Sequence, residues 1–293
     1  MAKKTTQEFD LKNYQFKETP RAVKILFKVL TYLFLTMACL LVIIPLLVVL
    51  IGAFKTHDEY ITTNVFTLPA VPQFENFAIA FVEGDVLLGL ANTGIILAVS
   101  CFGTIVTGTM TAFVLQRFGM MFTRFVKAVF LFASLLPNIS MQVTVFQIVS
   151  KLGMYDSMIA PCILYIGTDI ISITIFIQFL NNISVSLDES AILDGASYPR
   201  VYWSIILPML RPAIATVLVI KFVGIYNDFY TANLYMPSDP VVSTALYRFI
   251  GPYGAKWEII FAGIIICIIP SLIIFLSLQK FIYSNLVTGS VKE

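Results

Sequence analysis

The stretch SLDESAILDGASYPRVYWSIILP, residues 186–208, is polar and is punctuated by Gly195, Pro199 and Pro208. Long runs of Leu, Ile, Val and Phe lie on both sides of it. Such an insert marks a place where the chain leaves an apolar environment and then returns to it. The composition of the rest of the chain indicates what that environment is.

The chain has 293 residues, of which 58% are apolar and 12% are charged. A soluble domain usually has about 25% charged residues. The mean hydropathy is +0.89, and several apolar runs are long enough to cross a bilayer. Helices are expected, because lipid offers no partner for an open backbone amide or carbonyl. The composition therefore predicts an all-α polytopic membrane protein.

We expect six transmembrane helices, near residues 27–53, 88–115, 124–149, 157–181, 204–228 and 258–282. Each run can cross about 30 Å of hydrocarbon at about 1.5 Å per residue. The polar stretch thus falls between the fourth helix and the fifth.

Most of the 19 Lys and Arg residues lie in the N-terminal tail, in the second-to-third and fourth-to-fifth connections, and at the C-terminus. Cytoplasmic loops carry the excess of Lys and Arg. We therefore expect both termini and the polar stretch in the cytoplasm. The expected organisation is an N-terminal tail over 1–22, a six-helix membrane domain over 23–286 and a C-terminal tail over 287–293.

The polar stretch itself predicts a short, stiff helix. Ser186 and Glu189 have the spacing of a capping box, in which each side chain accepts the other residue's amide. The helix should run from about 187 to 194 and end at Gly195 in the left-handed conformation. Two interpretations stay open. The helix is only part of a connecting loop, or it is a projection that fits a groove on a partner.

Pro208 and Pro212 follow the polar stretch and should bend the start of the fifth span, because proline removes a backbone donor and clashes with the preceding turn.

The same stretch resembles the EAA loop of ABC importer permeases, in which Glu-Ala-Ala, Asp-Gly-Ala and Ile-x-Leu-Pro follow at set distances. Ser190 replaces the family's usual Ala and is also small. YNDFYTANLY, residues 226–235, resembles the Trp-Asn-Glu-Phe segment of sugar-importer permeases of the maltose-permease G type, with Tyr226 for Trp and Asp228 for Glu. The resemblance covers most of the chain from about residue 24 onward.

This resemblance implies a permease subunit of a binding-protein-dependent ABC importer for a carbohydrate, with an oligosaccharide as the expected cargo. The implied partners are a second permease subunit, two cytoplasmic ATPase subunits, an extracytoplasmic sugar-binding protein and membrane lipid. ATP and Mg would bind to the ATPase subunits, so we expect no cofactor in this chain. The implied location is the bacterial plasma (inner) membrane. The sequence does not name the sugar.

By the same resemblance, a helix at about 187–197 would be the coupling helix that contacts an ATPase subunit. Its expected contact residues are Glu189, Ser190, Ala191, Asp194, Gly195 and Ala196. The C-terminal tail would contact the ATPase through Gly289, Ser290, Val291 and Lys292.

A sugar path needs polar and aromatic side chains within the spans, because sugars are recognised by hydrogen bonds and aromatic faces. The candidates for lining it are Asn138, Gln142, Tyr226 and Asn227. Hydrogen bonding between helices is the alternative role for these residues.

A rival function is an ion-coupled secondary transporter that uses Asp169, Lys221 and Asp228 as a relay. It would require inverted repeats and helices broken at mid-membrane, which the sequence does not display. Lys221 could share a helix face with Asp228, seven residues on, or pair with Asp169.

A membrane-embedded enzyme would need a nucleophile with its base or a metal cluster. The one histidine, His57, cannot complete such a set. The four cysteines are far apart in apolar runs, where packing between helices is the expected role. The glycines Gly103 and Gly108 lack the lysine of a phosphate-binding loop and are expected at a helix contact. We therefore predict no catalytic residue, no metal site and no nucleic-acid partner.

Overall fold

The computed structural model describes residues 20–290 except 120, 168 and 253; the side chains of 138–140, 278 and 280–290 are not described. The chain divides into two compact units, Met1–Val48 and Val49–Glu293. Helix α1 (Arg21–Ala53) supplies the described part of the first unit and ends in the second. Its 33 residues are long and apolar enough to cross a membrane, as expected for the first span.

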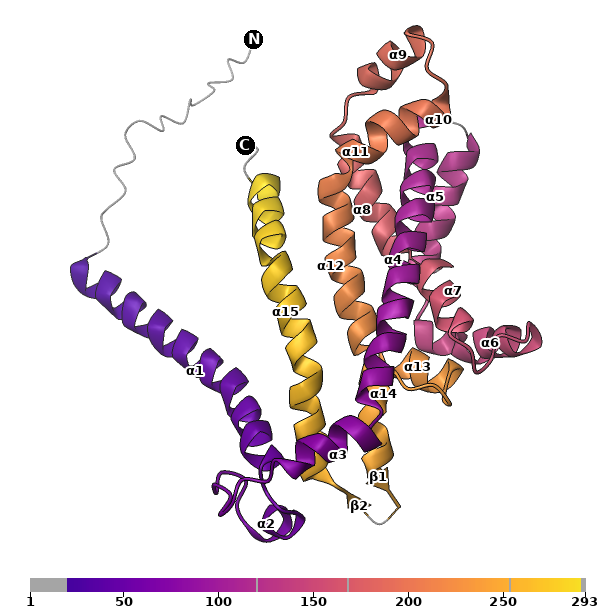
Figure 1. The fold of residues 1–293 in the computed structure, drawn as a ribbon. Coiled ribbons are helices and arrows are strands. Elements are labelled where there is room, and N and C mark those ends of the chain that lie inside the picture. Colours follow the sequence, from indigo (N-terminus) through magenta and orange to yellow (C-terminus); the bar gives the residue numbers. More distant parts are fainter. Residues whose placement is uncertain (1–19, 120, 168, 253, 291–293) are drawn as a thin grey trace, which may run out of the picture. The chain divides into compact units, whose positions relative to one another are not determined.

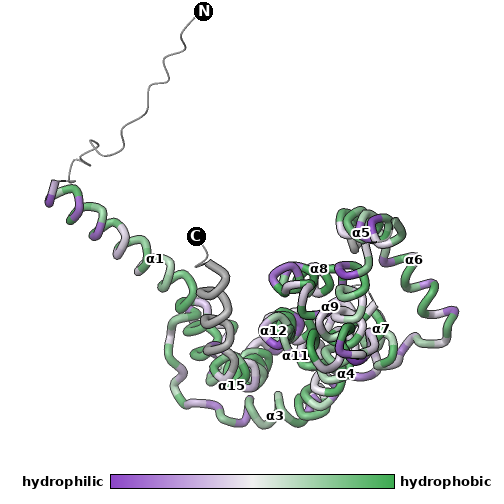
Figure 2. The backbone as a smooth tube through the Cα atoms, turned by 90° about the horizontal axis from the view of Figure 1, so that it is seen from above, coloured by the Kyte–Doolittle hydropathy of each residue, from purple (hydrophilic) through white to green (hydrophobic). Residues whose placement is uncertain are grey.

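In the second unit, long helices lie side by side around α4 (Figure 1). Helix α4 packs against α7, α8 and α12, and α12 packs against α15. Hydrophobic residues predominate along these helices (Figure 2). Their bounds are α4 Val86–Arg117, α7 Ile159–Gly167, α8 Ile170–Asn181, α12 Arg211–Asn227 and α15 Trp257–Ser290.

Short elements gather at the two opposite ends of this unit (Figure 1). One end carries α9 (Val185–Leu193), α10 (Tyr198–Val201), the π-helix η2 (Tyr202–Ile206) and α11 (Leu207–Met209). At or toward the other end lie α2 (His57–Thr62), α3 (Glu75–Glu83), α13 (Phe229–Tyr235), α14 (Val242–Ala245), η3 (Leu246–Phe249) and the antiparallel pair β1 (Ile250–Gly251) and β2 (Gly254–Ala255).

Among the described residues, four helical stretches pass as membrane spans by length and composition: Arg21–Ala53, Val86–Arg117, Ile159–Asn181 and Trp257–Ser277. The helices Tyr198–Met209 and Arg211–Asn227 pass only when taken together, and they are bent by 69° relative to one another. The bend falls at Leu210, between Pro208 and Pro212, as the sequence predicts.

The third expected span, 124–149, is not one helix, and that prediction was wrong. The structure has α5 (Met121–Ser134) and α6 (Asn138–Lys151), of 14 residues each, and α6 turns away from the direction of α5 (Figure 1). The break falls at Pro137, which has no N–H and disfavours helical conformation in the residue before it. A 14-residue helix is about 21 Å long, shorter than the hydrocarbon core.

The π-helix η2 lies between α10 and α11, just before the bend into α12. Tyr202 and Ile206 are buried, whereas Trp203 is 53% exposed. The Tyr202 hydroxyl lies 2.7 Å from Thr109 Oγ1 on α4. The wide turn is therefore packed directly against α4.

Two glycines on α4 allow α7 and α8 to approach closely. A Cβ on Gly103 would lie 2.3 Å from Ile166 Cδ1, and one on Gly108 would lie 3.0 Å from Phe176 Cε2. Small residues at such contacts let helices pack tightly in membranes. This confirms the packing role predicted for both glycines.

Gly103→Leu should destabilise the protein by about 1–3 kcal/mol, the usual cost of overfilling a packed contact. Gly94→Leu is the matched control, because Gly94 lies on the same helix and no atom lies within 4 Å of its added Cβ. The measurement is thermal unfolding of the purified protein in detergent. Equal midpoints for the two variants would contradict the packing assignment.

Candidate functional site

Helix α9 begins two residues earlier than the sequence predicts, and the predicted capping box is absent. The N-cap is Ser184, whose Oγ accepts the Ser186 amide at 3.3 Å. Ser186 thus lies inside the helix, where its carbonyl accepts the Ser190 hydroxyl at 2.7 Å. Asp188, within the first turns of this helix, contacts a residue far away in the sequence. Local residue spacing cannot predict such a contact.

The end of α9 is the predicted one. Gly195 has a φ of 87°, in the left-handed region. Its amide donates to Ile192 O and the Ala196 amide donates to Ala191 O, both at 2.9 Å. This pair of hydrogen bonds is a Schellman motif, which satisfies carbonyls that a helix end would leave free.

The residues expected to contact an ATPase divide between two sides of α9. Glu189, Ser190, Asp194 and Gly195 are exposed, whereas Ala191 and Ala196 are half-buried against the core. Glu189 and Asp194 have no ion-pair partner among the described residues. Large apolar side chains lie beside them, with Leu187 43% and Leu193 88% exposed. The helix therefore presents acidic and apolar groups together at one end of the unit.

A buried ion pair holds α9 on the end of α4, and sequence reasoning missed it. Arg117 Nε lies 2.6 Å from Asp188 Oδ2, and the two side chains are 7% and 8% exposed. Arg117 Nη2 also donates to the Ile183 carbonyl at 3.0 Å. The two partners are far apart in the sequence, so no local motif announces the pair.

Neighbouring contacts reinforce this joint. The Gln116 amide donates to Asn181 at the end of α8. The rings of Phe118 and Tyr198 have centroids 5.1 Å apart. These contacts fix α8 and α10, the elements on either side of α9, to the end of α4.

The charged residues within the spans pair with one another. Lys221 Nζ lies 2.8 Å from Asp169 Oδ2, with both side chains about nine-tenths buried, and it also donates to the Tyr165 carbonyl. The Tyr165 hydroxyl donates to Asp228 Oδ2 at 2.8 Å. The suggested Lys221–Asp169 pair is therefore present.

These contacts lie at a break between α7 and α8 that the sequence did not display. Asp169 is the N-cap of α8, with Oδ1 accepting the Ser172 amide at 3.1 Å. A helix that stops within a span leaves carbonyls without partners, and these need a donor from the protein. Lys221 supplies that donor from α12.

Two of the four path candidates come together. Tyr226 is buried and donates its hydroxyl to the Cys267 carbonyl at 2.6 Å. Asn227 is exposed and donates to its own helix, at Val223 O. Both line a cavity of about 200 Å³ between α12 and α15, together with Phe222 and Phe275.

The other two path candidates lie on α6, which does not line that cavity. Gln142 is partly buried there, and the side chain of Asn138 lies outside the described residues. Gly289 and Ser290 fall in the last turn of α15 with side chains that are not described, and Val291 and Lys292 lie outside the described residues.

The sequence of residues 94–287, more than half of the chain, matches the family described as binding-protein-dependent transport system inner membrane component. The chain belongs to this family. The resemblance stated from the EAA-like stretch is thereby confirmed, and the protein is a multi-pass membrane protein.

Several relatives align along nearly their whole length. The probable starch degradation products transport system permease protein AmyC of Thermoanaerobacterium thermosulfurigenes is 29% identical, over 90% of this chain and 96% of its own. The galactooligosaccharides transport system permease protein GanQ of Bacillus subtilis is 29% identical, over 93% and 97%. A chain of a bacterial ABC transporter that imports the acidic polysaccharide alginate shares the fold, with a TM-score of 0.77 at 19% identity over 89% of this chain and 98% of that one.

Lys221→Met should destabilise the protein by about 3–5 kcal/mol, because it leaves Asp169 buried without its counter-charge. Arg248→Met is the control: it breaks the exposed pair with Asp85, whose side chains are 45% and 46% exposed, and should cost under about 1 kcal/mol. Thermal unfolding in detergent measures both. If the two variants unfold together, Lys221 is not the buried partner described.

Proposed function

We propose that this chain is the permease subunit of an ABC importer for a carbohydrate, with an oligosaccharide as cargo. The observation that carries the proposal is the near full-length similarity to permease proteins named for starch degradation products and galactooligosaccharides. The family description adds that transport depends on a binding protein. The chain would form half of the path, with a second permease subunit forming the other half.

The topology that suits this function has six spans and both termini in the cytoplasm. The bent pair Tyr198–Met209 and Arg211–Asn227 would supply the fifth crossing. Helices α5 and α6 would together supply the third, in two pieces. The excess of Lys and Arg near the termini and beside α9 supports this orientation.

In this orientation α9 would be the coupling helix. Its exposed acidic and apolar side chains suit a cleft on a cytoplasmic ATPase subunit, which would bind ATP and Mg. Glu189 would accept hydrogen bonds from a basic residue there, and such a charged contact contributes about 1.5–3 kcal/mol. Because Arg117 and Asp188 tie α9 to α4, a displacement of α9 would reach the helices packed on α4.

The ion-coupled alternative gains one feature from the structure, the break between α7 and α8. The charges at that break nevertheless have internal partners, since Lys221 is held by Asp169 and Asp228 by Tyr165. A relay would have to strand one of these charges in a nearly buried site, which is costly. The importer is therefore the proposal.

The test purifies the tagged chain from its native membrane. We expect an ATPase and a second permease to co-purify, and sugar uptake by the reconstituted complex to require ATP. Uptake by this chain alone, driven by an ion gradient, would refute the importer.

In the same complex, Glu189→Lys should leave assembly intact and reduce the sugar transported per ATP hydrolysed by about tenfold, the equivalent of losing one charged hydrogen bond. Asp58→Lys is the control, because Asp58 is exposed at the opposite end of the unit. Unchanged uptake by Glu189→Lys would remove the coupling role.

Asn227→Ala tests the cavity between α12 and α15. Loss of a hydrogen bond to the passing sugar should lower uptake up to about tenfold while the complex still assembles. Asn233→Ala changes an exposed Asn on α13 that lies outside the cavity and should leave uptake unchanged. Equal effects of the two substitutions would show that Asn227 does not line the path.

A further inference from the structure

The segment YITTNVFTLPAVPQF, residues 60–74, contains no Asp, Glu, Lys, Arg or His. We call it the apolar loop. It connects α2 to α3 at the end of the unit opposite α9 (Figure 1). Six large apolar side chains along it are 44–73% exposed: Ile61, Val65, Phe66, Leu68, Val71 and Phe74. A group of large exposed apolar side chains is typical of an interaction site with a protein or a membrane.

Lys55, before the apolar loop, is buried and helps to hold it in shape, whereas His57, Asp58 and Glu75 beside the loop are exposed. Lys55 is 1% exposed, and its Nζ donates to Thr63 Oγ1 at 3.0 Å and to the Asn64 carbonyl at 2.7 Å. A buried ammonium group needs such partners. The chain from 55 to 64 is therefore closed around a cation that water hardly reaches.

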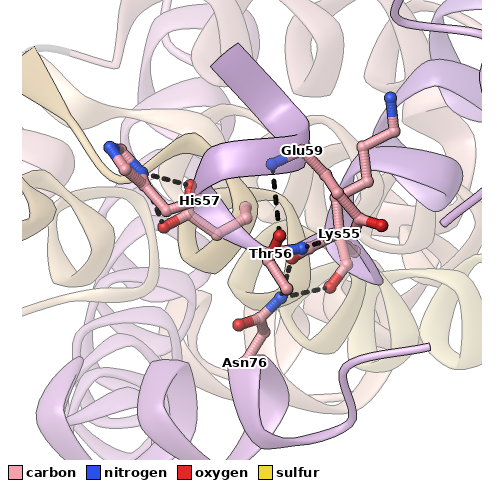
Figure 3. Close-up of polar contacts among 7 residues, drawn as sticks. Lys55, Thr56, His57, Glu59 and Asn76 are labelled. Carbon is pink, nitrogen blue, oxygen red and sulfur yellow. Dashed lines mark hydrogen bonds and ion pairs between the residues drawn. The ribbon is translucent and has the colours of Figure 1, made fainter. Parts of the chain in front are cut away.

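Glu59 fixes both ends of α2 and the far side of the loop. It forms a capping box with Thr56 (Figure 3). Its Oε1 also accepts the Ala70 amide at 3.0 Å. These backbone amides lower the pKa of Glu59. Asn76 donates to the carbonyls of Ala53 and Lys55, at 2.9 and 2.8 Å. The loop is thus held in shape by polar contacts, while its large apolar side chains are exposed beside Thr62, Thr63 and Thr67.

The loop packs onto the start of α15 through Tyr60, and onto Phe54, the residue after α1, through Phe74. The rings of Tyr60 and Phe261, in the second turn of α15, have centroids 5.7 Å apart. A Cβ on Gly52, near the end of α1, would lie 2.5 Å from the same Phe261 ring. Trp257, at the start of α15, is 43% exposed, and aromatic residues gather where spans meet the membrane–water interface.

We propose that the apolar loop lies in the membrane–water interface and that its exposed side chains contact lipid. The loop adjoins the start of α15, a helix long and apolar enough to cross a membrane, at the level where that helix begins. It carries no charge that could pair with a charged protein surface. A rigid framework that displays apolar groups outward suits a partner that is always present, and the bilayer is such a partner.

The test measures where labels on the loop lie. The four cysteines are replaced by Ala, and a nitroxide is attached at Leu68→Cys or Phe66→Cys. The chain, together with the subunits that accompany it, is then placed in phosphatidylcholine–phosphatidylglycerol vesicles. Spin relaxation by oxygen reports lipid, and relaxation by a water-soluble nickel chelate reports water. We expect the oxygen-to-nickel ratio to be several-fold higher at 66 and 68 than at Asp58→Cys, an exposed polar position on α2.

Two outcomes would overturn the proposal. Strong relaxation by nickel at 66 and 68 would place the loop in water, and weak relaxation by both reagents would show that a protein covers it. If the cysteine-free chain does not assemble, a photoreactive benzoylphenylalanine at position 68 of the otherwise native chain decides. A lipid adduct after irradiation supports the proposal, whereas a protein adduct or none refutes it. These outcomes do not depend on which solute is transported.

Discussion

A buried positive charge needs polar or acidic partners within the protein. This requirement determines the local structure at three places in the chain. Lys55 at one end of the second unit, Lys221 within the spans and Arg117 at the opposite end are all nearly buried. Each reaches at least one backbone carbonyl as well as a polar or acidic side chain. Removing one member of such a set strands the other. The apolar loop, the break between α7 and α8, and the position of α9 are thus each tied to one cation.

Helix α4 makes contacts at both ends of the second unit and along the middle. At one end Arg117 holds α9 through Asp188. Near the other end Asn92 donates to the Pro240 carbonyl at 2.8 Å, and Thr93 Oγ1 accepts the Val242 amide at 3.0 Å. Between them, glycines bring α7 and α8 into close contact. A displacement of the proposed coupling helix would therefore act on α4, a single helix that is held by specific contacts at both ends.

The sequence predicted the features that depend on local chemistry. Apolar runs located the helices, Gly195 located the left-handed turn, and the proline pair located the bend before α12. The misses have other causes. Pro137 was placed within a span because a long apolar run hid its effect. The burial of Lys55 depends on its contacts with Thr63 and Asn64, which the sequence does not reveal. The Arg117–Asp188 pair joins segments far apart in the sequence, so residue spacing does not encode it.

The π-helix at Tyr202–Ile206 has a consequence for the helix that follows it. A wide turn adds one residue relative to the α-helical count, and one residue corresponds to a rotation of about 100° around the helix axis. The residues before and after η2 therefore face directions that a regular helix would not give them. Deleting a single residue here would convert the wide turn to regular winding and leave the later side chains near their present directions, because the wide turn absorbs the extra residue locally. This short stretch thus accommodates one more residue than a regular helix without changing which face of the following helix meets its neighbours.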